Sequence, residues 1–301
     1  MKVSVIGASN IDICGSSSVR FTPQDSNPGR VTMTLGGVGR NVSHNLRLLE
    51  HEVSFFTAIG GDERAENIAR DCAMLGVDLS HALYRPDMKS SVYLCINDEK
   101  GELIAGIADM ELCEAITPDY LKRNLEHINS ADAVVFDTNL TAEAMEFLMK
   151  NCARPLFVDC VSCKKTEKLK AAMEAGGKLF TLKANRYEAE VLVGSRIKDG
   201  AAALEAAKTL CGKGVERVFI TLGADGVCCA DAEGSFLLPA LDADIANSSG
   251  AGDAFLAALV YALGKGADLR SSAEYGLKAA KIALESPSAV SASLSTTAIE
   301  N

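Results

Sequence analysis

The chain has 301 residues, and its 40 Asp and Glu outnumber its 30 Lys and Arg, which gives a formal net charge of −10. Apolar residues make up 48% of the chain, so we expect a globular protein rather than a disordered one. The acidic balance argues against nucleic acid or an anionic membrane as a partner, because both bind clustered Lys and Arg. The longest apolar run, Ala254–Leu263, is about half of the roughly 20 residues that span a bilayer. We therefore expect a cytoplasmic protein with reduced cysteines.

Short apolar segments alternate with longer amphipathic segments along most of the chain. The predicted strands are 3–7, 53–59, 133–136, 156–158, 178–182 and 217–221, and the predicted helices are 38–49, 63–75, 117–129, 141–152, 165–175, 186–193, 199–213 and 252–263. This alternation predicts an α/β fold with a mostly parallel sheet that helices cover on both faces. Sheets of this kind bind ligands at the carboxyl ends of their strands.

Two stretches, 11–35 and 90–107, interrupt this alternation. The first is rich in Gly, Ser and Pro among β-forming residues, and the second contains two strand-like runs around the turn Asn97–Gly101. A turn rich in Asn, Asp and Gly between such runs is typical of a hairpin. The two stretches could form one small β element inserted into the α/β body, or separate surface hairpins at different edges.

The most informative motif is Asn247-Ser248-Ser249-Gly250-Ala251-Gly252-Asp253, which precedes a strongly apolar helical segment. A small turn at a helix N-terminus directs backbone N–H groups toward phosphate-type anions, and glycine lets the anion approach the backbone. A carboxylate in such a site repels the bound anion and so costs electrostatic energy, which suggests that it has a chemical role. Asp253 could orient and deprotonate an attacking hydroxyl, or it could only cap the helix.

A second Gly-rich turn, Leu35–Asn41, opens the predicted helix 38–49. Its glycines would let backbone amides approach either a hydroxylated ligand or an anion. Polar side chains that suit the vicinal hydroxyls of a sugar follow several predicted strands, although each alone could be a solvated loop residue. These side chains are Asn10, Asp12, Asp137, Asn139 and Asp159.

Three further groups of residues allow a functional and a structural interpretation. Asn185 and Glu188 are three residues apart, so they share one helix face and could hold Mg²⁺-bound water, or form an N-terminal cap. The loop after the strand 217–221 could approach a nucleotide or could be a simple turn. Cys160 and Cys163 have C-x-x-C spacing, but a zinc site needs a second ligand pair, so we expect no metal or redox role.

In order and spacing, these motifs resemble the ribokinase-type (PfkB) carbohydrate kinases over nearly the whole chain. The residues that carry the resemblance are the Gly-Gly motif 36–41, the N-x-x-E element 185–188 and the turn 247–253. The resemblance implies a three-layer α/β/α fold and a single kinase domain over 1–301, with 11–35 and 90–107 as a β-stranded lid. It also implies ATP and Mg²⁺ as cofactors and a homodimer formed through the lid.

The resemblance further implies roles for individual residues. It places catalysis at Asp253 with the backbone amides of Gly250, Ala251 and Gly252, the substrate at Asn10, Asp12, Ser26, Gly36, Gly37, Asn41 and Asn139, the nucleotide at Asn185, Thr221, Gly223, Gly226, Gly250 and Gly252, and the water shell of Mg²⁺ at Glu188. Asn247 stands where the family usually has Asp, near its monovalent-cation site, so dependence on K⁺ is left open. Asp159 is followed by Cys160 instead of the family's usual Pro.

Two segments favour one substrate within the family. Val38-Gly39-Arg40 and Asp25-Ser26-Asn27-Pro28-Gly29 are similar to members that phosphorylate the 5′-hydroxyl of pseudouridine, with Ser26 and Lys164 or Lys165 as candidates for contacts with the uracil. One alternative is a kinase for another ribonucleoside or sugar. Another alternative, of a different class, is a non-catalytic nucleoside or sugar sensor.

Overall fold

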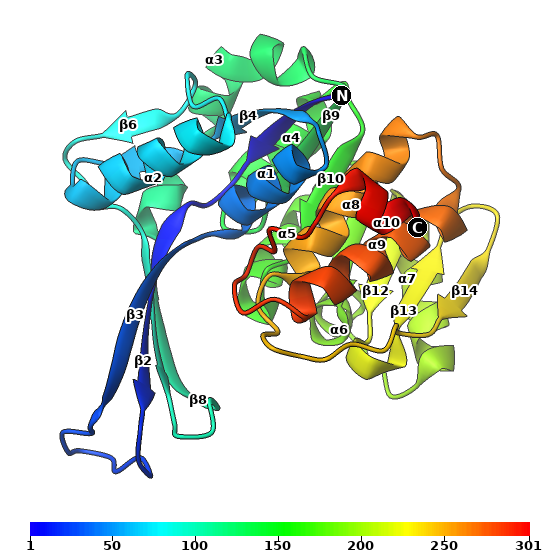
Figure 1. The fold of residues 1–301 in the computed structure, drawn as a ribbon. Helices are drawn as coiled ribbons and strands as arrows, with labels where there is room; N and C mark the ends of the chain where they lie inside the picture. Colours follow the sequence, from blue (N-terminus) through cyan, green and yellow to red (C-terminus); the bar gives the residue numbers. More distant parts are fainter.

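An eight-stranded sheet forms the centre of the larger part of the molecule in a computed structural model that describes residues 1–301 (Figure 1). Its strand order is β14-β13-β12-β11-β10-β9-β1-β4. The strands are β1 (Lys2–Ile6), β4 (Glu52–Phe56), β9 (Ala133–Asp137), β10 (Leu156–Asp159), β11 (Leu179–Asn185), β12 (Val215–Thr221), β13 (Val227–Ala230) and β14 (Ser235–Leu238). The six strands β4, β1, β9, β10, β11 and β12, in this order across the sheet, pair in parallel. Strands β13 and β14 add an antiparallel edge next to β12.

Helices cover both faces of this sheet. They are α1 (Val38–Leu48), α2 (Glu63–Leu75), α3 (Pro118–Asn129), α4 (Ala142–Asn151), α5 (Cys163–Glu174), α6 (Arg186–Val193), α7 (Gly200–Gly212), α8 (Ala251–Gly264), α9 (Leu269–Leu284) and α10 (Thr296–Glu300). Two separate hydrophobic clusters lie between the sheet and the helices. One contains 37 buried residues, with side chains from α3 to α7 on one face of the sheet. The other contains 31 buried residues, with side chains from α1, α2 and α8 to α10 on the opposite face. The predicted three-layer α/β/α fold is therefore confirmed.

The buried strands explain why the sequence shows unbroken apolar runs. All five residues of β9 are buried, and they alternate between the two hydrophobic clusters: Val134 and Phe136 face one, Ala133 and Val135 the other. A strand with helices on both sides has no solvent face, so it needs apolar residues at every position. The polar residue Asp137 comes only at the carboxyl end, where the strand reaches the ligand-binding edge of the sheet.

A second, four-stranded sheet projects from this body as an arm (Figure 1). Its order is β3-β2-β7-β8, and its strands are β2 (Asn10–Ser17), β3 (Gly29–Gly36), β7 (Val92–Asn97) and β8 (Leu103–Asp109). The irregular stretches 11–35 and 90–107 thus join in one β element, because β2 pairs in parallel with β7. A further small sheet pairs β5 (Ala58–Gly60) with β6 (Leu83–Arg85).

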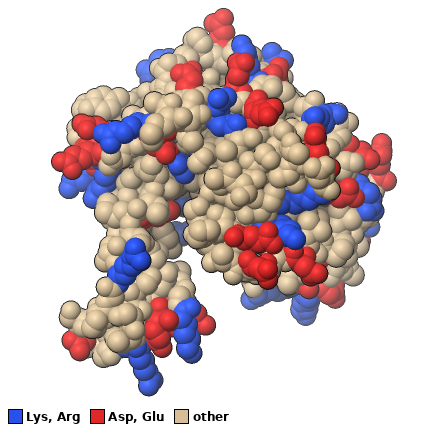
Figure 2. All heavy atoms as spheres, in the orientation of Figure 1, with Lys and Arg blue, Asp and Glu red and all other residues tan.

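Several element boundaries differ from the sequence prediction. The predicted strand 53–59 is divided at Thr57 into β4 and β5, which belong to different sheets. The edge strands β13 and β14 and the helices α9 and α10 are absent from the prediction. None of the helices combines the length and the apolar composition that a membrane span requires. Figure 2 shows that acidic and basic side chains are interspersed on the visible face of both the body and the arm.

Candidate active site

Asp253 lies in the first turn of α8, at the carboxyl end of the parallel strands. Its side chain is buried, with 7% of the residue exposed, and its Oδ2 accepts a hydrogen bond of 2.9 Å from Nδ2 of Asn41. Asn41 belongs to the first turns of α1, so the two Gly-rich turns predicted from the sequence meet here although 212 positions separate these two residues. The structure therefore brings the strongest and the second motif into direct contact.

The turn before Asp253 depends on glycine for its shape. Gly250 is the N-cap of α8 with φ of 83°, in the left-handed region, and a Cβ at this position would collide with the carbonyl oxygen of Ala289. A Cβ on Gly252 would collide with the ammonium group of Lys183. The turn accordingly presents bare backbone at a helix N-terminus, which fits the phosphate groups of a nucleotide.

Lys183 is a charged residue of the site that the sequence prediction missed. It lies in β11, and its Nζ is 2.8 Å from Oδ2 of Asp159 at the end of the neighbouring strand β10. Only 9% of the Lys183 side chain and 3% of the Asp159 side chain are exposed. Burial lowers the pKa of Lys183, but the facing carboxylates of Asp159 and Glu188 outweigh it and hold the pKa above its ordinary value. Lys183 is therefore a fixed positive charge beside the turn 250–252.

The surroundings of Asp253 raise the pKa of its carboxyl group. Burial, and next the negative charge of Asp159, raise the pKa of the Asp253 carboxyl group to about 7, while Lys183 and the hydrogen bond from Asn41 act in the opposite direction. A carboxylate with a pKa near neutrality is well matched to act as a general base at physiological pH. A helix cap alone would not require this burial.

A cavity of about 460 Å³ opens beside Asn41, the hydrogen-bond partner of Asp253, between the body and the base of the arm, and Asp253 itself is not among its lining residues. Its lining residues are Asn10, Asp12, Gly37, Val38, Asn41, Tyr93, Ala108, Met110, Asn139, Val161, Ser162, Lys164 and Lys165. The structure thus gathers most of the predicted substrate residues around one space, which we call the sugar-side cavity.

Short polar contacts hold the side chains of the sugar-side cavity in place. Asn10 donates a hydrogen bond of 2.6 Å to Asp12, and burial raises the pKa of Asp12 above its ordinary value. Gly36 does not line the cavity but lies against the Asp12 carboxylate, which a Cβ at residue 36 would strike. Lys165 donates to Oδ1 of Asn139. These contacts aim carboxylate, amide and ammonium groups at one ligand-sized space.

Asp137 does not line the sugar-side cavity but accepts hydrogen bonds from three segments that surround it. Its carboxylate accepts hydrogen bonds from the backbone N–H groups of Ala8, Gly39 and Asn139, at 2.9, 3.0 and 2.8 Å. It also accepts one from the Asn139 side chain. Asp137 thereby links the loop after β1, the start of α1 and the loop after β9.

A second cavity, of about 540 Å³, opens on the other side of the turn 250–252. It is lined mostly by apolar side chains and by backbone of the predicted nucleotide loop. The lining includes Thr221, Gly223, Gly226, Ile245, Ser248, Ala251, Gly252, Leu277 and Leu284. An apolar cleft that ends at a helix N-terminus suits a flat base at one end and phosphates at the other, so we call it the nucleotide-side cavity.

Asn185 and Glu188 form a capping box at the start of α6. Oδ1 of Asn185 accepts from the Glu188 N–H at 3.0 Å, and Oε2 of Glu188 accepts from the Asn185 N–H at 2.8 Å. The structural interpretation of this pair is therefore correct. Only Oε2 of Glu188 takes part in the box, and no group of three His, Cys, Asp or Glu side chains is arranged to hold a metal ion directly. These residues fit an Mg²⁺ ion held through water and nucleotide phosphates.

Four other residues that the sequence analysis singled out do not line either cavity. Ser26 is exposed in the loop between β2 and β3, away from the sugar-side cavity. The Asn247 side chain contacts backbone near its own turn, the Ser249 N–H at 2.9 Å and the Pro287 carbonyl at 3.4 Å. Cys160 is buried and Cys163 is exposed at the first position of α5, and both are free thiols.

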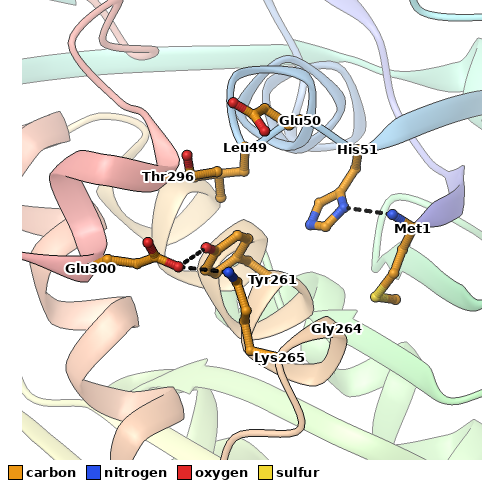
Figure 3. A pocket seen from close by; sticks show the side chains of 9 residues that line it. All are labelled: Met1, Leu49, Glu50, His51, Tyr261, Gly264, Lys265, Thr296 and Glu300. Carbon is orange, nitrogen blue, oxygen red and sulfur yellow. Dashed lines mark hydrogen bonds and ion pairs between the residues drawn. The ribbon is translucent and has the colours of Figure 1, made fainter.

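A third cavity, of about 270 Å³, lies at the opposite end of α8 and contains none of the predicted site residues (Figure 3). Glu300 of α10 accepts a hydrogen bond from Tyr261 and pairs with Lys265 at 2.7 Å (Figure 3). His51 lies 3.4 Å from the amino group of Met1. The contacts of Glu300 join α10 to the end of α8, so we regard this cavity as a structural junction.

The chain belongs to the pfkB family of carbohydrate kinases, whose family pattern matches residues 1–297. It is therefore a phosphotransferase of the class that acts on hydroxyl groups of sugars and nucleosides and uses ATP with a divalent metal, generally Mg²⁺.

Several proteins of this class are similar to the chain. It is 35% identical over 259 residues to the pseudouridine kinase of Escherichia coli, covering 85% of this chain and 82% of that one. It is 26% identical to the guanosine-inosine kinase of Exiguobacterium acetylicum, covering 93% of both chains. A carbohydrate kinase structure from Agrobacterium tumefaciens has a TM-score of 0.85 at 30% identity and covers 99% of this chain and 95% of its own. A ribokinase of Arabidopsis thaliana complexed with ribose and ATP has a TM-score of 0.84 at 17% identity, covering 99% of this chain and 98% of that one, and it supports the fold alone.

Proposed function

We propose that this kinase transfers the γ-phosphoryl group of ATP to the 5′-hydroxyl of pseudouridine. The observation that carries the proposal is that Asp253 lines neither cavity itself, but its immediate neighbours line both of them. Its hydrogen-bond partner Asn41 lines the sugar-side cavity, and the preceding residues Ala251 and Gly252 line the nucleotide-side cavity. A base at this junction can reach a hydroxyl on one side while the anion-binding turn holds a phosphoryl group on the other.

The proposed roles follow from these positions. Asp12, Asn41, Asn139 and the Gly37 backbone hold the ribose hydroxyls, and Asn10 orients Asp12. Asp253 accepts the proton of the 5′-hydroxyl as that oxygen attacks the phosphorus.

The nucleotide side supplies the second half of the mechanism. The backbone N–H groups of residues 250–252 stabilise charge on the phosphoryl oxygens, and Lys183 adds a positive charge beside Gly252. ATP would supply the γ-phosphoryl group and leave as ADP, and Mg²⁺ would neutralise the charge of its phosphates. Asn185 and Glu188 would hold the water shell of the ion, and Thr221, Gly223 and Gly226, which line the nucleotide-side cavity, would contact the nucleotide. The loop that contains Asn247 would be the region that binds a monovalent cation.

Pseudouridine as the substrate rests on similarity together with the cavity chemistry. The E. coli pseudouridine kinase is the relative with 35% identity, whereas the guanosine-inosine kinase, at 26%, supports a purine nucleoside as the second candidate. Lys164 and Lys165 line the sugar-side cavity and can donate hydrogen bonds to the carbonyl oxygens of a uracil. Ser26 can contact the base only if the loop between β2 and β3 moves from its present position toward the sugar-side cavity.

We also propose that residues 1–301 act as one kinase domain in which the arm serves as a lid. Asn10, Asp12, Tyr93 and Ala108, all from arm strands, already line the sugar-side cavity, so closure of the arm would exclude water from the reaction. Large apolar side chains on the arm are exposed to solvent, and Ile107 is 65% exposed. Such a patch favours a homodimer formed through the arms.

A coupled ADP-release assay tests the proposal. We expect ADP release from ATP that requires pseudouridine and that is lost in the Asp253→Asn variant. Binding of pseudouridine to the wild-type protein without any ADP release would instead support a nucleoside sensor. ADP release with guanosine or inosine, and none with pseudouridine, would support the purine nucleoside candidate.

A further inference from the structure

A chain of hydrogen bonds leads from helix α2 to Asp253 through a residue to which the mechanism gives no role. Arg40 is 8% exposed, and its Nε and Nη2 donate to Oδ2 of Asp71 in α2, at 3.0 and 2.7 Å. Its Nη1 donates to Oδ1 of Asn41 at 3.3 Å, and Nδ2 of Asn41 donates to Oδ2 of Asp253 at 2.9 Å. The side chains therefore follow one another in the order Asp71, Arg40, Asn41, Asp253.

The direction of these hydrogen bonds is fixed by the chemistry of arginine. A guanidinium group has five N–H donors and no acceptor, so only the oxygen of the Asn41 amide can face Arg40. The amide nitrogen then faces Asp253, where it stabilises the ionised carboxylate. If the Asn41 amide were reversed, its oxygen would face Asp253 and would accept a hydrogen bond from the protonated carboxyl group. The two orientations of Asn41 thus favour opposite protonation states of the proposed base.

We propose that Arg40 is a positioning residue for phosphoryl transfer, because it holds the Asn41 amide in the orientation that donates to the ionised Asp253. Asp71 in turn holds the guanidinium group in place through two hydrogen bonds. This inference rests on the proposed role of Asp253 as the base and adds a residue that lies outside both cavities.

Other charged groups lie around the hydrogen bonds that connect Asp71, Arg40, Asn41 and Asp253, and they could also respond to pH. Asp253 is faced by Asp159 at the end of β10, Lys183 in β11 and Asp137 at the end of β9. Arg40 is faced by Asp71 and Cys72 in α2, by His44 in α1 and by Asp12 in β2. Burial, and next the charge of Arg40, lower the pKa of His44 to about 4, so His44 stays neutral between pH 6 and 9. His44 therefore does not titrate together with Asp253 in this range. Asp12, whose pKa is raised by burial and lowered by the charge of Arg40, is distinguished from Asp253 by a titration of assigned carboxyl groups.

The test compares the Arg40→Met variant with a matched control in the same helix. Arg47→Met removes another arginine that ties α1 to its surroundings, since Arg47 donates to the carbonyl oxygens of Leu75 and His51, but it has no contact with Asn41. We expect the acid limb of the kcat/KM profile to move to higher pH by about half a unit or more in Arg40→Met, which is a roughly threefold loss at low pH beyond any loss at high pH. Arg47→Met should leave the position of the limb unchanged.

A second variant and a second readout keep the result decisive. Arg40→Lys retains a group that only donates, so it should bring the limb back toward the wild-type position. Titration of ¹³C-labelled aspartate carboxyl groups, with the Asp253 signal assigned by its loss in Asp253→Asn, should show the same upward shift without any turnover. A uniform loss of activity at every pH in Arg40→Met, with an unmoved carboxyl titration, would overturn the positioning role. Full activity of Asp253→Asn would instead overturn the proposed function itself.

Discussion

The pH dependence of turnover follows from the burial of Asp253. The proposed base works only when its carboxyl group is ionised, and burial together with Asp159 raises its pKa to about 7. About one tenth of the protein would then hold an ionised Asp253 at pH 6, about half at pH 7, and about nine tenths at pH 8. We therefore predict that kcat/KM for the nucleoside rises about tenfold between pH 6 and pH 8.

The assay for this prediction is coupled ADP release at constant ionic strength with saturating ATP and Mg²⁺. Doubling the coupling enzymes at each pH shows that they do not limit the rate. Calorimetric titration of the nucleoside into Asp253→Asn serves as the control for binding, and its affinity should change little over the same range. A kcat/KM that is flat from pH 6 to pH 8 would refute the assignment of a near-neutral base at residue 253.

Three substitutions test other parts of the account. Asp253→Asn should lower kcat at least about 100-fold in steady-state assays while the Kd of the nucleoside, measured by calorimetry, stays nearly unchanged; near-normal kcat would contradict the role of the base. Lys183→Met leaves Asp159 buried without its partner, so urea unfolding should show a loss of about 3–5 kcal/mol, part of which the double variant with Asp159→Asn recovers; equal stability of single and double variants would refute the pairing. Gly250→Ala should lower the free energy of unfolding far more than Gly266→Ala, because both have positive φ but only residue 250 faces a backbone oxygen within collision distance; equal losses would contradict the turn geometry.

Most of the sheet could be predicted because buried parallel strands require apolar residues at every position. The strand 133–136 is almost the same as β9, Ala133–Asp137. The edge strands β13 and β14 were harder to predict, since β13 contains only four residues and follows β12 after a short turn. Helix α9 was missed although Leu269–Leu284 begins at an Asp268 cap, a signal that could have revealed it.

The candidate site could be predicted in part because glycines and a carboxylate occur together in one short turn, 250–253. The contact between Asn41 and Asp253 could not be read from either turn alone, because it depends on the packing of α1 against α8. The pair of Asp159 and Lys183 depends on the register of β10 and β11, in which these two residues are direct neighbours. A lysine between apolar residues in Leu182-Lys183-Ala184 was the available signal, since a buried lysine requires a negatively charged partner.

The identity of the phosphoryl acceptor can be determined with one panel of candidate acceptors. The measurement is kcat/KM for pseudouridine, uridine, guanosine, adenosine, ribose and fructose with the same ATP and Mg²⁺ concentrations. We expect pseudouridine to give the highest value, at least about tenfold above uridine, because the base must match hydrogen-bonding groups in the sugar-side cavity. Turnover of ribose or fructose without turnover of pseudouridine would contradict this expectation.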